Sequence, residues 1–297
     1  MEKGPAMDQK TSGWMNGLAG VLIFSGSLPA TRAAVSDIDP VFLTLARAAI
    51  AGSISLTLLV TTRQRIPTWA EVRSLVGVAL GVVVGFPLLT ALALRHMAAG
   101  HAIVFTGLLP LSTAAFAVLR GGERPSPPFW LFAVLGGGFV AAFALAGGGA
   151  STPQGDLLML AAIAVCGFGY AEGAVLSRRL GGWQVISWAL TLALPAMLVA
   201  LLFVTPPDWA TVGAPAYAGL AYVSLFSMLI GFVFWYRGLA QGGTAAVGQI
   251  QLLQPMFALV LAAALLREPV GASMILVSLA VVACVAGARH FSIRTAV

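Results

Sequence analysis

Ten long apolar segments, separated by short breaks rich in polar residues, glycine and proline, account for nearly the whole chain. Each is close to the roughly 20 residues that an α-helix needs to cross the hydrocarbon core of a bilayer. No stretch alternates as a strand of a membrane barrel would, and backbone groups without partners are costly in lipid. The pattern therefore predicts an all-α integral membrane protein with ten transmembrane helices, at about residues 13–33, 40–61, 71–94, 99–120, 128–147, 155–177, 183–204, 214–236, 244–266 and 270–289.

The fourth and ninth segments share a spacing that predicts a duplication. Each has a proline near its centre, Pro110 and Pro255, and a glutamate shortly after it, Glu123 and Glu268. The prolines and the glutamates are separated by the same distance (255 − 110 = 145 and 268 − 123 = 145). The two halves therefore correspond, and the prolines are candidate hinges because each removes a backbone donor from mid-helix.

We expect two five-helix repeats within a single membrane domain, at residues 13–147 and 155–289, with tails at 1–12 and 290–297. Because each repeat crosses the membrane an odd number of times, the second must be inverted relative to the first. Inverted-topology repeats are typical of secondary transporters, in which two similar halves expose a central site to alternate sides.

Composition agrees with the hydrophobic pattern. Apolar residues make up 59% of the chain and charged residues 9%, against about 25% charged residues in a soluble domain. The net charge of +6 is spread singly or in pairs between the apolar segments, so no basic surface for nucleic acid is expected. The two cysteines lie inside apolar segments and have no metal-ligand spacing, and we expect neither a metal nor a cofactor.

Lysine and arginine positions predict the orientation. With the N-terminus inside, the inner segments carry 12 basic residues and the outer ones three, and Arg47 lies within the second helix. This bias predicts that both termini are cytoplasmic. Tryptophans near segment ends are typical of interfacial belt residues, and we also interpret Trp235 and Tyr236 in this way.

The fourth and ninth segments also carry a family resemblance. The first ends in L-R-G-G-E-R-P (Leu119–Pro125) and the second in L-L-R-E-P (Leu265–Pro269). With the tandem five-helix unit, these features resemble the drug/metabolite transporter superfamily, EamA type, over about Gly13 to Gly287. Among its members the chain is most similar to bacterial exporters of aromatic amino acids. The resemblance implies a bacterial inner-membrane protein with a central cavity between the first, third, fourth, sixth, eighth and ninth helices, the others being peripheral.

Glu172 is the sharpest candidate for a site residue, because a carboxylate inside the sixth segment is costly unless it faces a cavity or a partner. It could contact a substrate ammonium group or couple transport to protons. The alternative is a carboxylate near the headgroups, paired with Arg178 or Arg179.

Gln251 and Gln254 share a face of the ninth segment, next to Pro255. The proline frees a backbone carbonyl at mid-depth, where transporter sites form, which favours a role in binding. Structural hydrogen bonds to neighbouring helices would explain the glutamines equally well.

The remaining candidates are a histidine, three aromatic rings and two serines. His101 could titrate near neutral pH, although a solvated interfacial histidine is the more ordinary explanation. Aromatic rings at three positions could stack on a flat substrate or simply pack in the core. The serines lie in a small-residue stretch that predicts an interrupted first helix, although tight packing explains it almost as well. The aromatic and serine candidates are Tyr170, Tyr222, Phe86, Ser25 and Ser27.

These features favour an exporter of small amphiphilic metabolites, aromatic amino acids first, working by alternating access. A proton-coupled exporter of drugs or other cationic compounds is the alternative in the same superfamily. A membrane-embedded enzyme is disfavoured, since no HExxH motif, carboxylate pair or Ser/His pair is present at a plausible depth. The expected partners are a small-molecule substrate and membrane lipid, with no obligatory protein partner.

Overall fold

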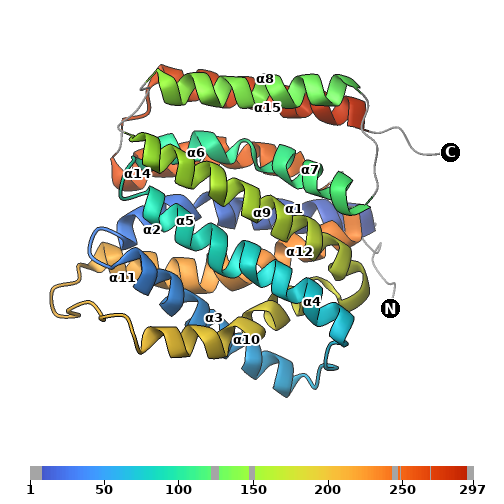
Figure 1. Ribbon diagram of the computed structural model, residues 1–297, viewed down its shortest axis with the longest axis vertical. Coiled ribbons are helices and arrows are strands. Elements are labelled where there is room, and N and C mark those ends of the chain that lie inside the picture. Colours follow the sequence, from blue (N-terminus) through green and yellow to red (C-terminus); the bar gives the residue numbers. More distant parts are fainter. Residues whose placement is uncertain are drawn as a thin grey trace, which may run out of the picture.

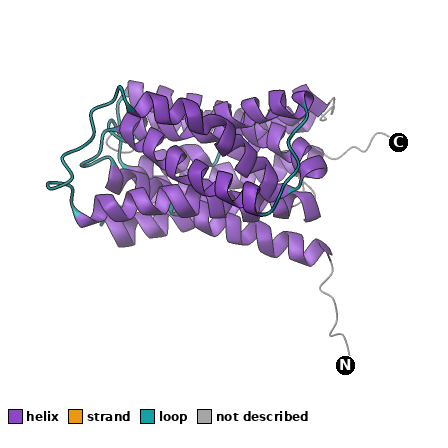
Figure 2. Ribbon diagram, turned by 90° about the horizontal axis from the view of Figure 1, so that it is seen from below, coloured by secondary structure: helices purple, strands orange, loops and turns teal. Residues whose placement is uncertain are grey.

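The computed structural model describes residues 9–121, 127–146, 151–242, 247, 249–267 and 269–292. Helices run along one common axis throughout this part of the chain (Figure 2). Within the described residues the only β-type pairing is an isolated bridge between Met97 and Ser151. The expectation of an all-α fold is therefore confirmed.

Within the described residues the helices group into ten consecutive segments, each of which overlaps one of the predicted ones. Several segments contain a break or a change of helix type, so they comprise more than one named helix. In order they are α1 (Gln9–Ser25) with α2 (Ser27–Ala34), α3 (Pro40–Thr61), α4 (Trp69–Val78) with η1 (Ala79–Gly85) and α5 (Phe86–Ala93), α6 (Ala99–Thr106) with α7 (Leu109–Gly121), α8 (Pro127–Leu145), α9 (Pro153–Leu180), α10 (Gly182–Leu201), α11 (Ala214–Ala221) with η2 (Tyr222–Ile230) and α12 (Gly231–Gly242), η3 (Gln249–Leu253) with α14 (Gln254–Leu266), and α15 (Ala272–Ser292).

Six of these segments are long and apolar enough to cross a membrane: 40–61, 69–93, 99–116, 153–180, 182–201 and 214–241. Shorter apolar helices occur in α8, α14 and α15. The count of ten crossings stays a prediction, as does the orientation.

Local sequence explains where several helices begin. Asp39 caps α3, since its carboxylate accepts hydrogen bonds from the backbone N–H groups of Val41 and Phe42. Thr68 and Glu71 form a reciprocal capping box at the start of α4. Arg65, in the loop before it, donates to both Glu71 oxygens at 2.9 and 2.7 Å. This hydrogen bond raises the pKa of the Arg65 guanidinium. Polar groups thus hold this end of the segment.

The predicted interruptions fall at Gly26 and at the two central prolines. The first segment breaks at Gly26, between α1 and α2. Pro110 is the second residue of α7, and Pro255 is the second residue of α14, directly after the 3₁₀ segment η3. A proline is tolerated in the first turn of a helix because the N–H that it lacks would have no partner there. Both prolines therefore start a new helix within a segment.

Two π-helical stretches, η1 and η2, occupy corresponding places in the third and eighth segments, 143 residues apart (222 − 79 = 143). Each ends at a backbone N–H that donates to the carbonyl five residues earlier, Phe86 to Gly81 and Gly231 to Phe226. The hydrophobic pattern did not predict these stretches, because π-type turns barely change which positions are apolar. Such local widening of a helix often accompanies a functional site.

The helices form a layered bundle with a pair at each edge. The ribbon view places α8 with α15 along one edge and α3 with α10 along the other, with the remaining helices between them (Figure 1). This arrangement agrees with the implied peripheral position of the fifth and tenth segments. The buried hydrophobic core extends through both halves of the chain, from α1 and α3 to α12 and α14.

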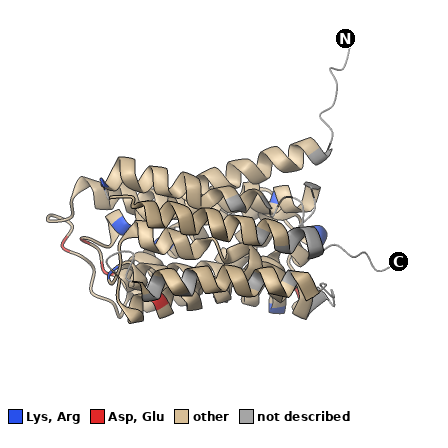
Figure 3. Ribbon diagram, turned by 90° about the horizontal axis from the view of Figure 1, so that it is seen from above, with Lys and Arg blue, Asp and Glu red and all other residues tan. Residues whose placement is uncertain are grey.

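Charged residues gather near the two ends of the bundle, and the stretch between them is almost free of charge (Figure 3). The start of α1 and the end of α15 lie at the same end (Figure 1). Glu123 and Glu268, on which the duplicated spacing partly rests, lie outside the described residues.

Candidate functional site

A cavity lies at the centre of the bundle, lined by residues from both halves of the chain. Its walls leave about 500 Å³ between them, open solvent included, and little of that space is wide enough for water. The walls are therefore nearly closed on each other in this conformation. The lining residues are Phe24, Ser27, Leu28, Thr31, Arg47, Val82, Phe86, Pro87, Thr90, Leu109, Tyr170, Ser227, Phe232 and Gln254.

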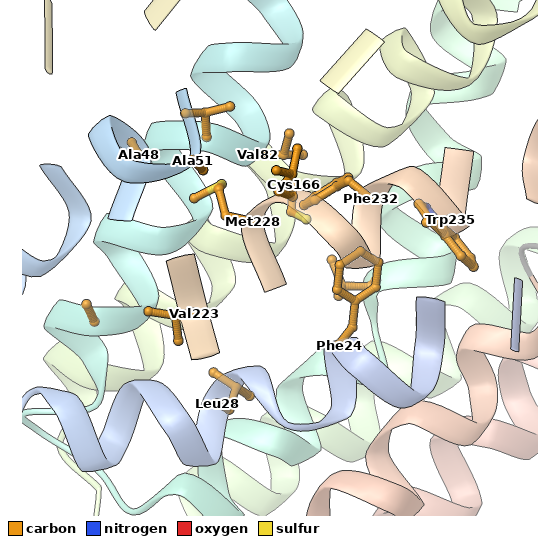
Figure 4. Close-up of a cluster of buried hydrophobic side chains, with 14 of the residues drawn as sticks. Phe24, Leu28, Ala48, Ala51, Val82, Cys166, Val223, Met228, Phe232 and Trp235 are labelled. Atoms are coloured by element: carbon orange, nitrogen blue, oxygen red, sulfur yellow. The ribbon is translucent and has the colours of Figure 1, made fainter. Parts of the chain in front are cut away.

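Aromatic rings form one wall of this cavity. Phe24 and Phe232 meet edge to face at a centroid distance of 4.9 Å, and both lie within the buried cluster around the cavity (Figure 4). Tyr170 packs edge to face on Phe232 at 6.0 Å. The half-buried ring of Phe86 contributes from α5. Such a wall favours a flat apolar group in the ligand.

Hydroxyl and amide groups line another part of the cavity. Ser27 and Ser227 join the first and eighth segments through their Oγ atoms, 2.8 Å apart. Gln254 is buried, and its side-chain oxygen has no hydrogen-bond partner among the described residues. Ser25 lies behind the wall and donates to the backbone carbonyls of Val21 at 2.7 Å and Gln254 at 3.4 Å. Its hydroxyl therefore ties α1 to α14.

Gln251 lies one turn before Gln254 and is buried beside the Tyr170 hydroxyl, with which its side chain interacts. It does not line the cavity. Of the two candidate glutamines, the structure thus brings Gln254 to the cavity and leaves Gln251 behind Tyr170.

Arg47 is a cavity residue that was not among the candidates. Only 5% of its surface is exposed, and Nη2 donates to Ser227 Oγ at 3.1 Å. The implied lining excluded the second segment, yet α3 supplies this side chain. An arginine inside an apolar segment was visible in the sequence, but which face of α3 it occupies depends on how α3 packs against α10 and η2.

Tyr222 lies outside the cavity, where it holds the interrupted first segment. Its hydroxyl donates to the Ile23 carbonyl at 2.7 Å, and its ring stacks on Phe226 at 5.5 Å. A Cβ atom at Gly26 would collide with the Tyr222 hydroxyl, so a larger residue there would have to displace the Tyr222 side chain.

Replacing Tyr222 by phenylalanine should therefore lower stability without changing ligand affinity. The lost hydrogen bond is worth about 1 kcal/mol, which corresponds to a fall in Tm of roughly 2–4 °C. Thermal unfolding in detergent and a ligand-binding measurement test the two parts of this prediction.

Phe86→Ala should have the opposite pattern, because Phe86 lines the cavity. We expect it to weaken binding of an aromatic ligand about two- to tenfold. A change in affinity for Tyr222→Phe larger than for Phe86→Ala would contradict this division.

Glu172 lines a different cavity, of about 620 Å³ including open solvent, with Arg73, Ser74 and Phe168. It is 5% exposed and lies on α9 beyond the central cavity. Tyr170 and Glu172 are only two residues apart, and this spacing points their side chains to different faces of a helix. The structure therefore does not bring Glu172 together with the residues that line the central cavity.

His101 is fully buried, so its expected solvated, interfacial position is wrong. Its Nε2 lies 3.1 Å from Asp156 Oδ1, and its ring packs between Phe105 and Phe143 at 5.5 and 4.5 Å. Asp156 lies in the first turn of α9, and just before it Ser151 and Thr152 pair with Met97 and His96, which precede α6. His101 thus connects the two halves of the chain outside the central cavity.

The interpretation of Trp235 and Tyr236 as belt residues is also wrong, because they are 2% and 0% exposed. Their helix, α12, packs along α1, and Gly20 brings the backbone of α1 against Trp235. Trp14, Trp69, Trp130 and Trp209, by contrast, are between 42% and 78% exposed near segment ends, as a belt requires.

In the described part of the chain, no group of three histidine, cysteine or acidic side chains lies close enough together to bind a metal ion. Cys166 and Cys284 are both free and buried. The chemistry of the central cavity is therefore that of hydroxyl, amide, aromatic and guanidinium groups.

Comparison with known proteins places the chain. The model of the EamA-like transporter family matches it twice, at residues 11–145 and 153–289. The chain belongs to this family. It is a multi-pass membrane transporter, and the two matches fall one in each predicted half.

Two individual proteins are similar to this EamA-family transporter. An uncharacterized transporter of Bacillus subtilis (strain 168), YdeK, is 64% identical over 286 residues, covering 96% of this chain and 100% of that protein. A protein of known crystal structure superposes with a TM-score of 0.66 at 19% identity, covering 94% of this chain and 96% of its own. The latter supports the fold alone, and neither indicates a substrate.

Proposed function

We propose that this EamA-family transporter exports small amphiphilic metabolites, with aromatic amino acids as the leading substrates. The observation that carries the proposal is the central cavity, which combines an aromatic wall of Phe24, Tyr170 and Phe232 with polar groups from both halves. A flat apolar group would lie against the rings while its polar end meets Ser227 and Gln254. Sites of this composition are typical for small molecules.

Transport would proceed by alternating access. The walls are nearly closed, so loading requires the two halves to move apart. Pro110 and Pro255 start the second helix of their segments at corresponding places. Since neither proline can donate a backbone hydrogen bond, these are the points at which we propose that the segments bend.

We further propose that the ten segments all cross the bacterial inner membrane, with both termini in the cytoplasm. The basis is the lysine and arginine bias together with the position of both chain ends at one end of the bundle. Reporter fusions at residue 297 that are active only in the cytoplasm would support this orientation. Activity of a periplasm-specific reporter there would overturn it.

Flux in liposomes tests the substrate. Purified protein is reconstituted, and uptake of labelled phenylalanine, threonine and a lipophilic dication is followed with and without a pH gradient. We expect saturable phenylalanine flux that exceeds threonine flux, because threonine lacks a ring for the aromatic wall. If only the dication moves, the amino-acid proposal fails and the drug-exporter alternative replaces it.

The variant Glu172→Gln separates binding from proton coupling. Because Glu172 lies at a different cavity and does not line the central one, we expect the KM for phenylalanine to change less than about twofold, or under about 0.5 kcal/mol in binding free energy. Flux that follows the pH gradient in the wild type and loses that dependence in Glu172→Gln would make this carboxylate the coupling group. A large rise in KM would contradict its separation from the substrate.

A further inference from the structure

We propose that Arg47 forms a carboxylate-binding subsite in the central cavity, so that the transported molecule carries an organic carboxylate beside its apolar group. This inference rests on the proposed function in taking the central cavity as the substrate site. It goes further in naming the charge of the substrate and the residue that recognises it.

The buried position of Arg47 makes its positive charge energetically costly unless an anion lies beside it. It is the eighth residue of α3, roughly 10 Å along the helix from Pro40, inside a segment long and apolar enough to cross a membrane. The side chain is 95% buried in protein rather than reaching a headgroup region. Charged groups at such depth usually face a cavity and mark the path of a substrate or ion.

The protein supplies little to offset this charge. A guanidinium has five N–H donors, and among the described residues the one hydrogen bond of Arg47 goes to the neutral hydroxyl of Ser227. Its Nε has no partner among the described residues. The described residues that line the cavity include no aspartate or glutamate, and the ion pairs Arg65–Glu71 and Arg95–Asp39 lie elsewhere. The cavity therefore holds a cation without a protein carboxylate beside it.

The neighbouring groups orient Arg47 and suit a carboxylate. Ser227 Oγ, which accepts the hydrogen bond from Arg47 Nη2, also forms a hydrogen bond with Ser27 Oγ at 2.8 Å. The Ser227 hydroxyl is therefore fixed between the first and eighth segments. Planar guanidinium groups match carboxylates through paired N–H donors, and such charge-assisted bonds are about twice as strong as neutral ones. The side-chain oxygen of Gln254, in the same cavity, has no partner among the described residues and would suit an ammonium group. Together with the aromatic wall, these groups fit an aromatic α-amino acid and disfavour a simple lipophilic cation.

The test uses three ligands that share a benzene ring and differ in the charged groups that they carry. Phenylalanine has an ammonium and a carboxylate group, 3-phenylpropionate has only the carboxylate, and 2-phenylethylamine has only the ammonium group. Binding to full-length protein in detergent is measured as the rise in Tm with ligand concentration. We expect phenylalanine and 3-phenylpropionate to bind the wild type about ten- to hundredfold more tightly than 2-phenylethylamine. This ratio is the affinity that hydrogen bonds to a charged group contribute.

Variants assign the preference to Arg47. In Arg47→Gln the carboxylates should lose about ten- to hundredfold in affinity while the amine loses none, and Arg47→Lys should recover part of the loss. Arg73→Gln is the matched control, because Arg73 is exposed and lines the other cavity. It should leave all three affinities unchanged. If Arg47→Gln does not fold, the three ligands with the wild type still test whether the cavity prefers a carboxylate.

The outcomes separate this inference from the proposed function. Arg47-dependent binding of 3-phenylpropionate without phenylalanine flux would leave the subsite standing and overturn the amino-acid substrate. Phenylalanine flux with equal affinities for 3-phenylpropionate and 2-phenylethylamine would keep the proposed function and overturn the subsite. Failure of both carboxylates to bind the wild type would also overturn the subsite.

Discussion

Replacing Gly81 by alanine should destabilise the protein strongly, because η1 crosses α9 there with backbone against backbone. A Cβ atom at Gly81 would lie 2.6 Å from the Val165 carbonyl oxygen and 2.7 Å from the Gly169 Cα atom. These are main-chain atoms, so no side chain can turn aside to make room. Overpacking of this kind costs about 1–3 kcal/mol or more, and we expect Tm to fall by roughly 5–10 °C.

The matched control is Gly137→Ala on α8, where an added Cβ atom would meet nothing within 4 Å. Alanine is favoured over glycine in a helix by about 1 kcal/mol, so this variant should be as stable as the wild type or slightly more stable. Thermal unfolding followed by size-exclusion chromatography in detergent compares the two. Equal Tm values for Gly81→Ala and Gly137→Ala would contradict the close crossing of η1 and α9.

Breaking the contact between His101 and Asp156 should have an effect of similar size. His101→Ala leaves a gap between Phe105 and Phe143 and removes the partner of a carboxylate that is only 16% exposed. Loss of a hydrogen bond to a charged group costs about 1.5–3 kcal/mol. Asp156→Ala leaves the Nε2 atom of a buried imidazole without its partner, at about 1–3 kcal/mol.

A double-mutant cycle shows whether the two side chains act together. If they do, His101→Ala/Asp156→Ala should be less destabilising than the sum of the single variants, with a coupling free energy of about 1–3 kcal/mol. The measurement is the free energy of unfolding in a denaturing detergent series. His96→Ala is the control, since His96 is half-buried and belongs to the loop before α6. A coupling free energy within error of zero would show that the contact contributes nothing.

The helical segments were predictable because each break carries its own chemistry. The expected 40–61 and 99–120 became Pro40–Thr61 and 99–121. Asp39–Pro40 starts the first of these, with Asp39 as the capping residue. The central prolines likewise marked interruptions. The π-helical stretches were not predictable, because π-type turns barely change which positions are apolar.

The site was only partly predictable, because most candidates were chosen by residue type rather than by the face they occupy. Four of them, Gln254, Tyr170, Phe86 and Ser27, line the central cavity. Ser25 and Gln251 lie behind its wall, and Glu172, His101 and Tyr222 face other neighbours. Arg47 was seen in the second segment but was not considered, because that segment was expected to be peripheral. Burial of Trp235 and Tyr236 came from the close packing of α12 on α1.

The sequence by itself determined the membrane class, the helical segments and the duplication, because lipid demands long apolar helices and prolines and glycines mark their ends. Only the tertiary structure decided which polar groups meet. In helices that are apolar on nearly every side, hydrophobic periodicity does not distinguish the face toward lipid from the face toward protein. The rotation of each helix, and with it the place of Arg47 in the cavity and of His101 against Asp156, follows from close packing between helices.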